Sequence, residues 1–126
     1  MTVASKIRSY RDLTVWQRAM DLADMTYEFA KRFPRDERFA LTSQVQRAAV
    51  SIPSNIAEGH GREHLREYLH HLSIANGSLM ELETQVAIAL RRGYVDSAEA
   101  QRCLDLSGDV GRLLAGLVRA LKARLG

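Results

Sequence analysis

The sequence is poor in cysteine, in long apolar runs and in glycine-rich loops. Its single cysteine, Cys103, excludes an intrachain disulfide and any cysteine-based zinc site. No stretch approaches the ~20 apolar residues that a membrane span needs. The first residues also form no apolar run long enough for a signal peptide. We therefore expect a cytoplasmic protein with no membrane partner.

The remaining composition is that of one ordinary globular domain. The chain has 126 residues, of which 46% are hydrophobic and 26% are charged. This length fits the usual size of a single domain and allows a sizeable core. We expect one domain over residues 1–126, with residues 1–10 as an N-terminal extension.

Apolar residues recur at helical spacing along nearly the whole chain, and no strand-like alternation appears. The pattern predicts helices over about 13–33, 36–59, 63–92 and 97–124, with Asp36 and Ser97 as N-caps and Phe39 on the inner face of the second helix. Pro34 ends the first helix, and Pro53 should kink the second. The connections are too short for a crossover. The predicted fold is therefore all-α, an antiparallel up-down-up-down four-helix bundle.

The last helix carries more apolar surface than one bundle core needs. A second stripe of Leu114, Val118, Leu121 and Leu125, displaced around the helix from the first, widens the apolar arc beyond the usual ~100°. The candidate interface residues on this helix are Leu114, Leu117, Val118 and Leu121. This surplus lies either under the N-terminal residues Val3, Ile7 and Leu13 or in an oligomer interface. Large exposed apolar patches are rare on monomers, which favours the interface.

A polar stripe runs along the second predicted helix. It consists of Gln44, Arg47, Ser51, Asn55 and Glu58, at steps of three and four residues. One interpretation is a solvated face. The other is a hydrogen-bonded seam between subunits, or the lining of a cavity in an oligomer.

Two short motifs resemble metal sites, but neither has the context it needs. His60 and His64 match H-x-x-E-H, yet Gly59 and Gly61 end the helix that should place both histidines on one face. A single E-x-x-H at Glu67 cannot form a di-iron site, which needs two such motifs. Cys103 lies on an apolar seam, and we expect it to be an inert thiol in the core. We therefore expect that the protein is not an enzyme and that it binds no metal and no cofactor.

The charge is modestly basic and dominated by arginine. Lysine and arginine total 18 against 15 acids, a net charge of +3, and 15 of the cations are arginine. Arginine binds phosphate and carboxylate in a bidentate manner, so nucleic acid and protein partners are both possible on charge alone. The candidate nucleic-acid contacts lie in basic clusters near helix ends: Arg8, Arg11, Arg62, Arg66, Arg119, Lys122 and Arg124.

Several segments resemble one known family. They are Y-R-D-L-x-V-W from Tyr10, R-F-P from Arg32, L-T-S-Q from Leu41, R-A-A-V-S-I-P-S-N-I-A-E-G from Arg47, G-S-L-x-E-L-E-T-Q from Gly77 and G-Y at Gly93. Over about residues 10–122 the chain resembles the four-helix-bundle family of 23S ribosomal RNA intervening-sequence proteins, which is related in fold to the accessory variability protein of diversity-generating retroelements. The resemblance implies a homopentamer and an association with nucleic acid. It supplies no catalytic or ligand residues.

Together these observations predict a non-catalytic, homo-oligomeric helical protein, a pentamer, that binds RNA or DNA through phosphates. Five copies would carry a net charge of about +15, and multivalent binding to a polyanion would strengthen accordingly. The alternative is a protein-interaction scaffold that binds a protein partner and no nucleic acid.

Overall fold

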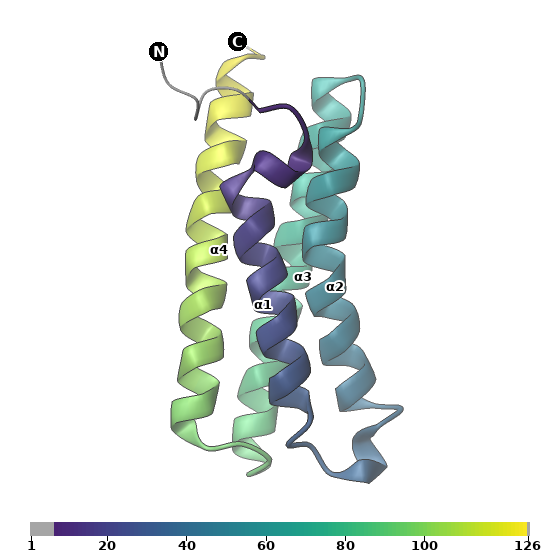
Figure 1. Cartoon of the computed structure of the whole chain (residues 1–126), viewed down its shortest axis with the longest axis vertical. Helices are drawn as coiled ribbons and strands as arrows, with labels where there is room; N and C mark the ends of the chain where they lie inside the picture. Colours follow the sequence, from purple (N-terminus) through teal and green to yellow (C-terminus); the bar gives the residue numbers. More distant parts are fainter. Residues whose placement is uncertain (1–6, 126) are drawn as a thin grey trace.

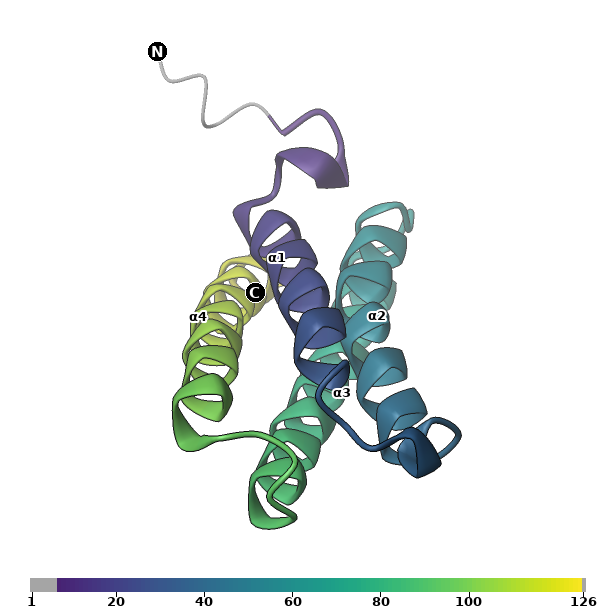
Figure 2. The same cartoon turned by 60° about the horizontal axis from the view of Figure 1, so that its bottom comes forward.

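The protein is an all-α bundle of four helices, as the sequence predicted (Figure 1). A computed structural model describes residues 7–125. In it, α1 spans Thr14–Ala30, α2 Leu41–His60, α3 Leu65–Arg91 and α4 Ser97–Ala123. Successive helices run in opposite directions, as the colours in Figure 1 and the turned view in Figure 2 show. Each helix contacts the helices before and after it in a closed cycle, with α1 also against α4.

The core is built from the predicted seams. On α3 the whole heptad seam from Leu72 to Ala89 is buried, because steps of three and four residues keep one face towards the other helices. The largest fully buried aliphatic side chains come from all four helices: Leu22, Ile52, Ile56, Leu72, Leu79, Leu82 and Leu114. One continuous apolar cluster therefore joins the bundle along its length. No helix within residues 7–125 combines the length and apolar character that crossing a membrane requires.

The start of α2 differs from the prediction. Arg35–Glu37 form a separate 3-10 turn, η3, and α2 begins only at Leu41. Glu37 explains the break, because its carboxylate accepts hydrogen bonds from the Tyr94 hydroxyl at 2.6 Å and from the Leu41 backbone N–H at 3.2 Å. The predicted N-cap at Asp36 is therefore wrong. Phe39 is also not on an inner face, since 86% of it is exposed.

The start of α4 is shifted by one residue for a similar local reason. Asp96, and not Ser97, is the N-cap, and it forms a capping box with Glu99 in which each side chain accepts the other's backbone N–H. Before it, Gly93 has a φ of 75°, a left-handed conformation that favours glycine. This turn sends the chain from α3 back along α4.

Pro53 lies inside α2, which continues through it to His60. The residue is buried against the other helices. A proline at this position removes one backbone hydrogen bond to the carbonyl of Ala49. The kink expected from that loss stays a prediction.

Candidate functional site

One end of the bundle, which we call the basic end, gathers every cation that the sequence analysis selected. The alternating helix directions bring together the start of α1, the end of α2, the start of α3 and the end of α4 (Figure 1). The seven cations are Arg8, Arg11, Arg62, Arg66, Arg119, Lys122 and Arg124. The same segments contain four acids, Asp12, Glu58, Glu63 and Glu67. Residues separated by most of the chain therefore lie at the same end of the bundle, where cations outnumber acids.

Three of these arginines have local partners, Arg62 and Arg11 through their charged groups and Arg8 through its backbone, with its guanidinium attracted to Asp12 without forming an ion pair. Arg62 forms an ion pair with Glu58 at 2.6 Å. The Arg11 guanidinium lies 5.3 Å from the centre of the Tyr10 ring and 6.0 Å from that of Trp16, within the range of cation–π attraction. Arg8 donates its backbone N–H to Asp12 at 2.8 Å, which together with the N–H of Ser9 lowers the pKa of the Asp12 carboxyl.

The other four cations keep their charged groups free. Arg66, Arg119, Lys122 and Arg124 are exposed and form no ion pair with any residue of the described range. A free guanidinium or ammonium can bind an external anion without first breaking an internal contact. These four are the side chains at this end that are best suited to phosphate or carboxylate.

The histidines at the basic end do not form a metal site. His60 is in the last turn of α2 with its ring edge-on to Tyr68, whereas His64 has extended backbone just before α3. The H-x-x-E-H motif is therefore split between two segments, as its glycines suggested. Across residues 7–125 no three His, Cys, Asp or Glu side chains gather in a way that could hold a metal ion.

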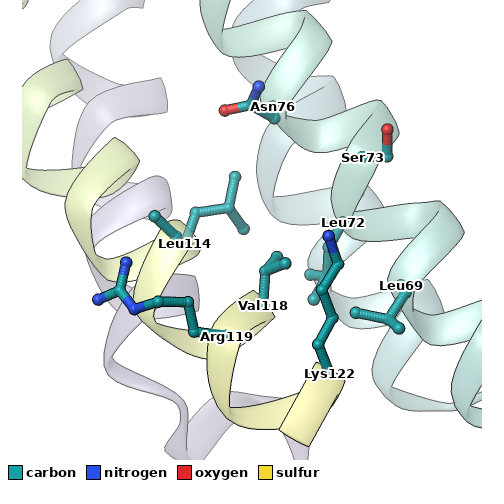
Figure 3. Close-up of a pocket in the computed structure, with 9 residues that line it drawn as sticks. Leu69, Leu72, Ser73, Asn76, Leu114, Val118, Arg119 and Lys122 are labelled. Carbon is teal, nitrogen blue, oxygen red and sulfur yellow. The ribbon is translucent and has the colours of Figure 1, made fainter. Parts of the chain in front are cut away.

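A groove of about 480 Å³ lies between α3 and α4 next to the basic end (Figure 3). Its apolar floor is formed by Leu72 and Leu114, which are buried, and by Leu69 and Val118, which are partly buried. Polar side chains border it: Ser73 and Asn76 on α3, Arg119 and Lys122 on α4. We call it the α3/α4 groove.

The apolar surplus of α4 is divided differently from the expectation. Leu114 and Leu121 are 1% and 4% exposed within the single chain, so they are core residues with little surface left for an interface. Leu117 is partly buried against the core and lines a second hollow together with Ile7 and Leu13, so it lies beside these N-terminal residues without being covered by them. Val3, the third N-terminal residue of that expectation, lies outside the described residues.

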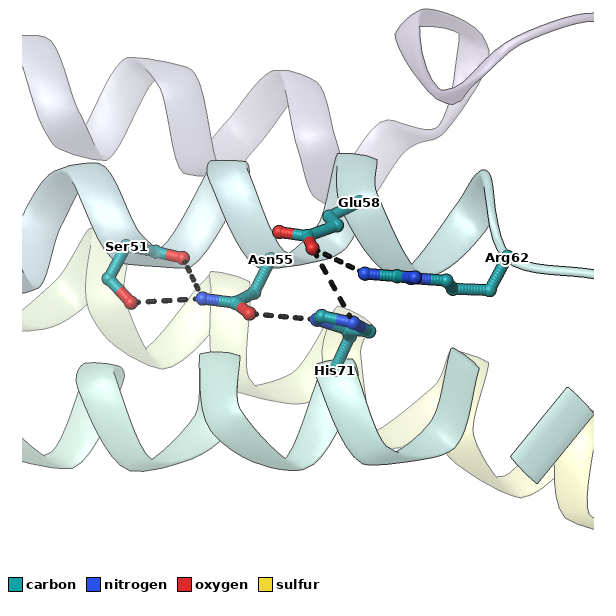
Figure 4. A network of polar contacts seen from close by, with 5 residues as sticks. All are labelled: Ser51, Asn55, Glu58, Arg62 and His71. Carbon is teal, nitrogen blue, oxygen red and sulfur yellow. Dashed lines mark hydrogen bonds and ion pairs between the residues drawn. The ribbon is translucent and has the colours of Figure 1, made fainter. Parts of the chain in front are cut away.

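Part of the polar stripe of α2 faces α3 in the same chain, and a hydrogen-bond network joins the two helices there (Figure 4). The Ser51 and Ser78 hydroxyls lie 2.7 Å apart. Asn55 donates from its amide nitrogen to the carbonyl and hydroxyl of Ser51 at 2.9 and 3.1 Å. That leaves its amide oxygen, 3.0 Å from His71 Nδ1, as an acceptor, so Nδ1 carries a hydrogen. Glu58 lies 3.8 Å from His71 Nε2.

This network settles the position of only part of the stripe. Ser51, Asn55 and Glu58 belong to a seam within one chain, between α2 and α3, whereas Gln44 and Arg47 are exposed. The sequence contains a signal for the row of polar partners on α3. His71, Ser78 and Gln85 follow each other at intervals of seven on α3, the spacing that places polar side chains on one edge of a helix.

A glycine lets the two helices approach closely at this seam. A Cβ built on Gly59 would lie 2.7 Å from the Cβ of His71 and 3.1 Å from a ring carbon of Tyr68. Real Cβ atoms do not approach so closely, so only glycine fits here without movement. The end of α2 is therefore held tightly against the first turns of α3.

Cys103 is a buried thiol in the middle of the bundle, as predicted. Burial raises its pKa to about 11, despite a hydrogen bond with Thr26 that acts in the opposite direction. Ser107, also buried, donates to Glu83 at 2.5 Å. Thr26 also donates its hydroxyl to the Leu22 carbonyl at 2.7 Å, so each of these buried polar groups has a hydrogen-bond partner.

Comparisons with known proteins agree with this architecture. The model of the 23S rRNA-intervening sequence protein family matches residues 11–116. The structure is similar to the crystal structure of a protein of unknown function from the S23 ribosomal protein family of Bacteroides thetaiotaomicron. The TM-score is 0.77 at 20% sequence identity, covering 83% of this chain and 98% of the other. No curated protein matches the sequence.

Proposed function

Because the chain belongs to the 23S rRNA-intervening sequence protein family, we propose that it is a cytoplasmic, non-catalytic homo-oligomer, a pentamer, that binds RNA or DNA through phosphates. The family has no established activity to transfer. The proposal therefore depends on the surface of this chain and on what repeated copies of that surface would do.

The basic end is the observation that carries the proposal. Seven cations selected from sequence positions 8 to 124 lie on segments that end at the same side of the bundle, and four of them form no ion pair within residues 7–125. A protein that neutralises phosphates releases the counterions condensed on the nucleic acid. With four free cations, the slope of log affinity against log salt should be roughly −3 to −4 per subunit engaged on a duplex.

Assembly would turn a weak contact into a useful one. A net charge of +3 on one chain is modest. Several copies on one polyanion bind at a high effective concentration, which can raise affinity by about 10²–10⁴ without new kinds of contact. The pentamer is thus part of the binding mechanism.

A salt titration tests the proposal directly. Fluorescence anisotropy of end-labelled RNA and DNA oligonucleotides should show binding at about 50 mM salt that weakens steeply as salt rises. Arg66→Glu with Arg124→Glu should weaken binding and flatten the salt slope. The matched control is Arg35→Glu with Arg91→Glu, the same charge change at the opposite end of the bundle, which should leave both unchanged.

The result that refutes nucleic-acid binding is equally plain. If the wild-type protein binds neither RNA nor DNA at low salt, the basic end has another role. An equal loss with the control pair would show that only net charge matters.

The second candidate function is a protein-interaction scaffold without nucleic-acid binding. The α3/α4 groove favours it, because an apolar floor bordered by free cations suits a protein surface as well as a polyanion. Pull-down from nuclease-treated lysate separates the two functions. A scaffold keeps its protein partner there, whereas partners held through nucleic acid are lost.

A further inference from the structure

The outward side of α1 carries an apolar and acidic surface that stays exposed within residues 7–125. Met20 and Tyr27 are 40% and 44% exposed, seven residues apart, with Asp24 between them. Asp24 is exposed and makes no ion pair with any of the residues 7–125. We call these three residues the α1 outer face. Their spacing of i, i+4 and i+7 is that of a helix presenting anchors to a groove.

The α3/α4 groove is apolar and basic, whereas the α1 outer face is apolar and acidic, and the two surfaces are of similar length. It is lined by residues from Leu69 to Asn76 on α3 and from Leu114 to Lys122 on α4, which are runs of i to i+7 and i to i+8. At 1.5 Å per residue these runs are about 10.5 and 12 Å long, which accommodates the roughly 10.5 Å between Met20 and Tyr27. Figure 3 shows Lys122 reaching from α4 towards α3, above the apolar floor.

We infer that the α1 outer face of one copy docks into the α3/α4 groove of a second copy. The two apolar anchors would cover the floor, and Asp24 would meet the free cations Arg119 and Lys122. Carboxylate against guanidinium and ammonium is the pairing that gives an interface its register and excludes wrong partners. The inference depends on the proposed homo-oligomer and names the contact within it.

The position of the two surfaces sets the kind of assembly. α1 has no contact with α3 within the chain, so the face and the groove lie on different sides of the bundle. A contact between unlike surfaces is heterologous, and repeated copies close into a ring when the rotation permits. It also divides the basic end, because Arg119 and Lys122 would serve assembly while Arg66 and Arg124 stay available for phosphates. In the assembled protein the salt slope expected from the four free cations would then fall to roughly −2 per subunit.

Charge reversal tests the contact. Light scattering after size exclusion should show an oligomer for the wild-type protein at micromolar concentration. Asp24→Lys alone, or Arg119→Glu with Lys122→Glu, should raise the dissociation concentration about tenfold or more, because like charges then face each other. Combining the two changes should restore assembly in large part. Glu81→Lys, another exposed helical acid without an ion pair in the described range, is the matched control and should not change the mass.

A photocrosslinker gives an independent measurement. Tyr27→benzoylphenylalanine should link, after irradiation, to peptides from 69–76 or 114–122 of another copy. Crosslinks elsewhere, or a wild-type oligomer that both charge reversals leave intact, would overturn the inference while the proposed oligomer stands. Loss of RNA binding by the Arg119 and Lys122 variant with no change in mass would overturn it too. A wild-type protein that stays at 14.2 kDa would refute the pentamer itself.

Discussion

The close approach of α2 and α3 predicts opposite effects for one substitution at two helical glycines. Gly59→Ala places a Cβ 2.7 Å from the Cβ of His71, a contact that requires backbone movement, whereas Gly77→Ala places a Cβ in open space. Alanine favours a helix over glycine by about 1 kcal/mol, which acts at both sites. Overpacking typically costs about 1–3 kcal/mol. Displacing His71 from Asn55 would add about 1 kcal/mol for the lost hydrogen bond.

The net expectation is that Gly59→Ala destabilises the protein by about 1–3 kcal/mol and Gly77→Ala stabilises it by about 1 kcal/mol. With a urea slope of roughly 2 kcal/mol per molar, the midpoint should fall by about 0.5–1.5 M in the first variant and rise by about 0.5 M in the second. Circular dichroism at one fixed protein concentration measures both, since assembly makes stability concentration-dependent. A Gly59→Ala midpoint at or above that of the wild type would refute the close approach.

Three further outcomes follow from the described contacts. Asn55→Ala leaves His71 Nδ1 without its acceptor, so thermal unfolding should show a loss of about 1–3 kcal/mol; a change within error would mean that water replaces the amide at no cost. Cys103, with its pKa raised to about 11 from 9.0, should hold roughly 100-fold less thiolate than an ordinary thiol and resist iodoacetamide at pH 8 until the protein unfolds; labelling of the native protein within minutes would contradict this. The Tyr94 hydroxyl holds the pKa of Glu37 below 4.5, so its contribution to stability is present above that pH and is lost as pH falls further. Urea unfolding between pH 6 and 3 should therefore show a steeper loss for the wild type than for Glu37→Gln, and parallel curves would count against the bond.

The helices and their apolar seams could be predicted because the spacing of apolar residues is a local signal that repeats along each helix. The α3 seam needs only the spacing of apolar residues, and that spacing continues without a break from Leu72 to Ala89. The start of α2 could not be predicted in this way. It depends on Glu37, whose partner Tyr94 is 57 residues away and draws the chain into η3. Periodicity carries no information about such a contact, and Phe39 was misplaced for that reason.

The candidate site shows the same division between local and distant information. The gathering of cations at the basic end follows from alternating helix directions, so the predicted topology already contained it. The nearly complete burial of Leu114 and Leu121 could not be predicted in this way. An apolar arc on one helix does not show how much of that arc the other helices cover. Some apolar residues of α4 are in the core, one lies beside the N-terminal residues and others line the α3/α4 groove. Which residue lies where depends on the positions of α1 and α3, which the sequence of α4 alone does not contain.

The polar seam also decides where the ends of α2 and α3 stand along the bundle. An apolar seam of leucine and alanine repeats every seven residues, so two such helices can slide by one heptad and still bury apolar surface. Such a slide would separate Ser51 from Ser78 and Asn55 from His71, leaving polar groups without partners at about 1–3 kcal/mol each. It would also move the close approach at Gly59 onto residues with larger side chains. The network therefore selects one register, and that register sets the end of α2 and the start of α3 beside the end of α4, where the basic end forms.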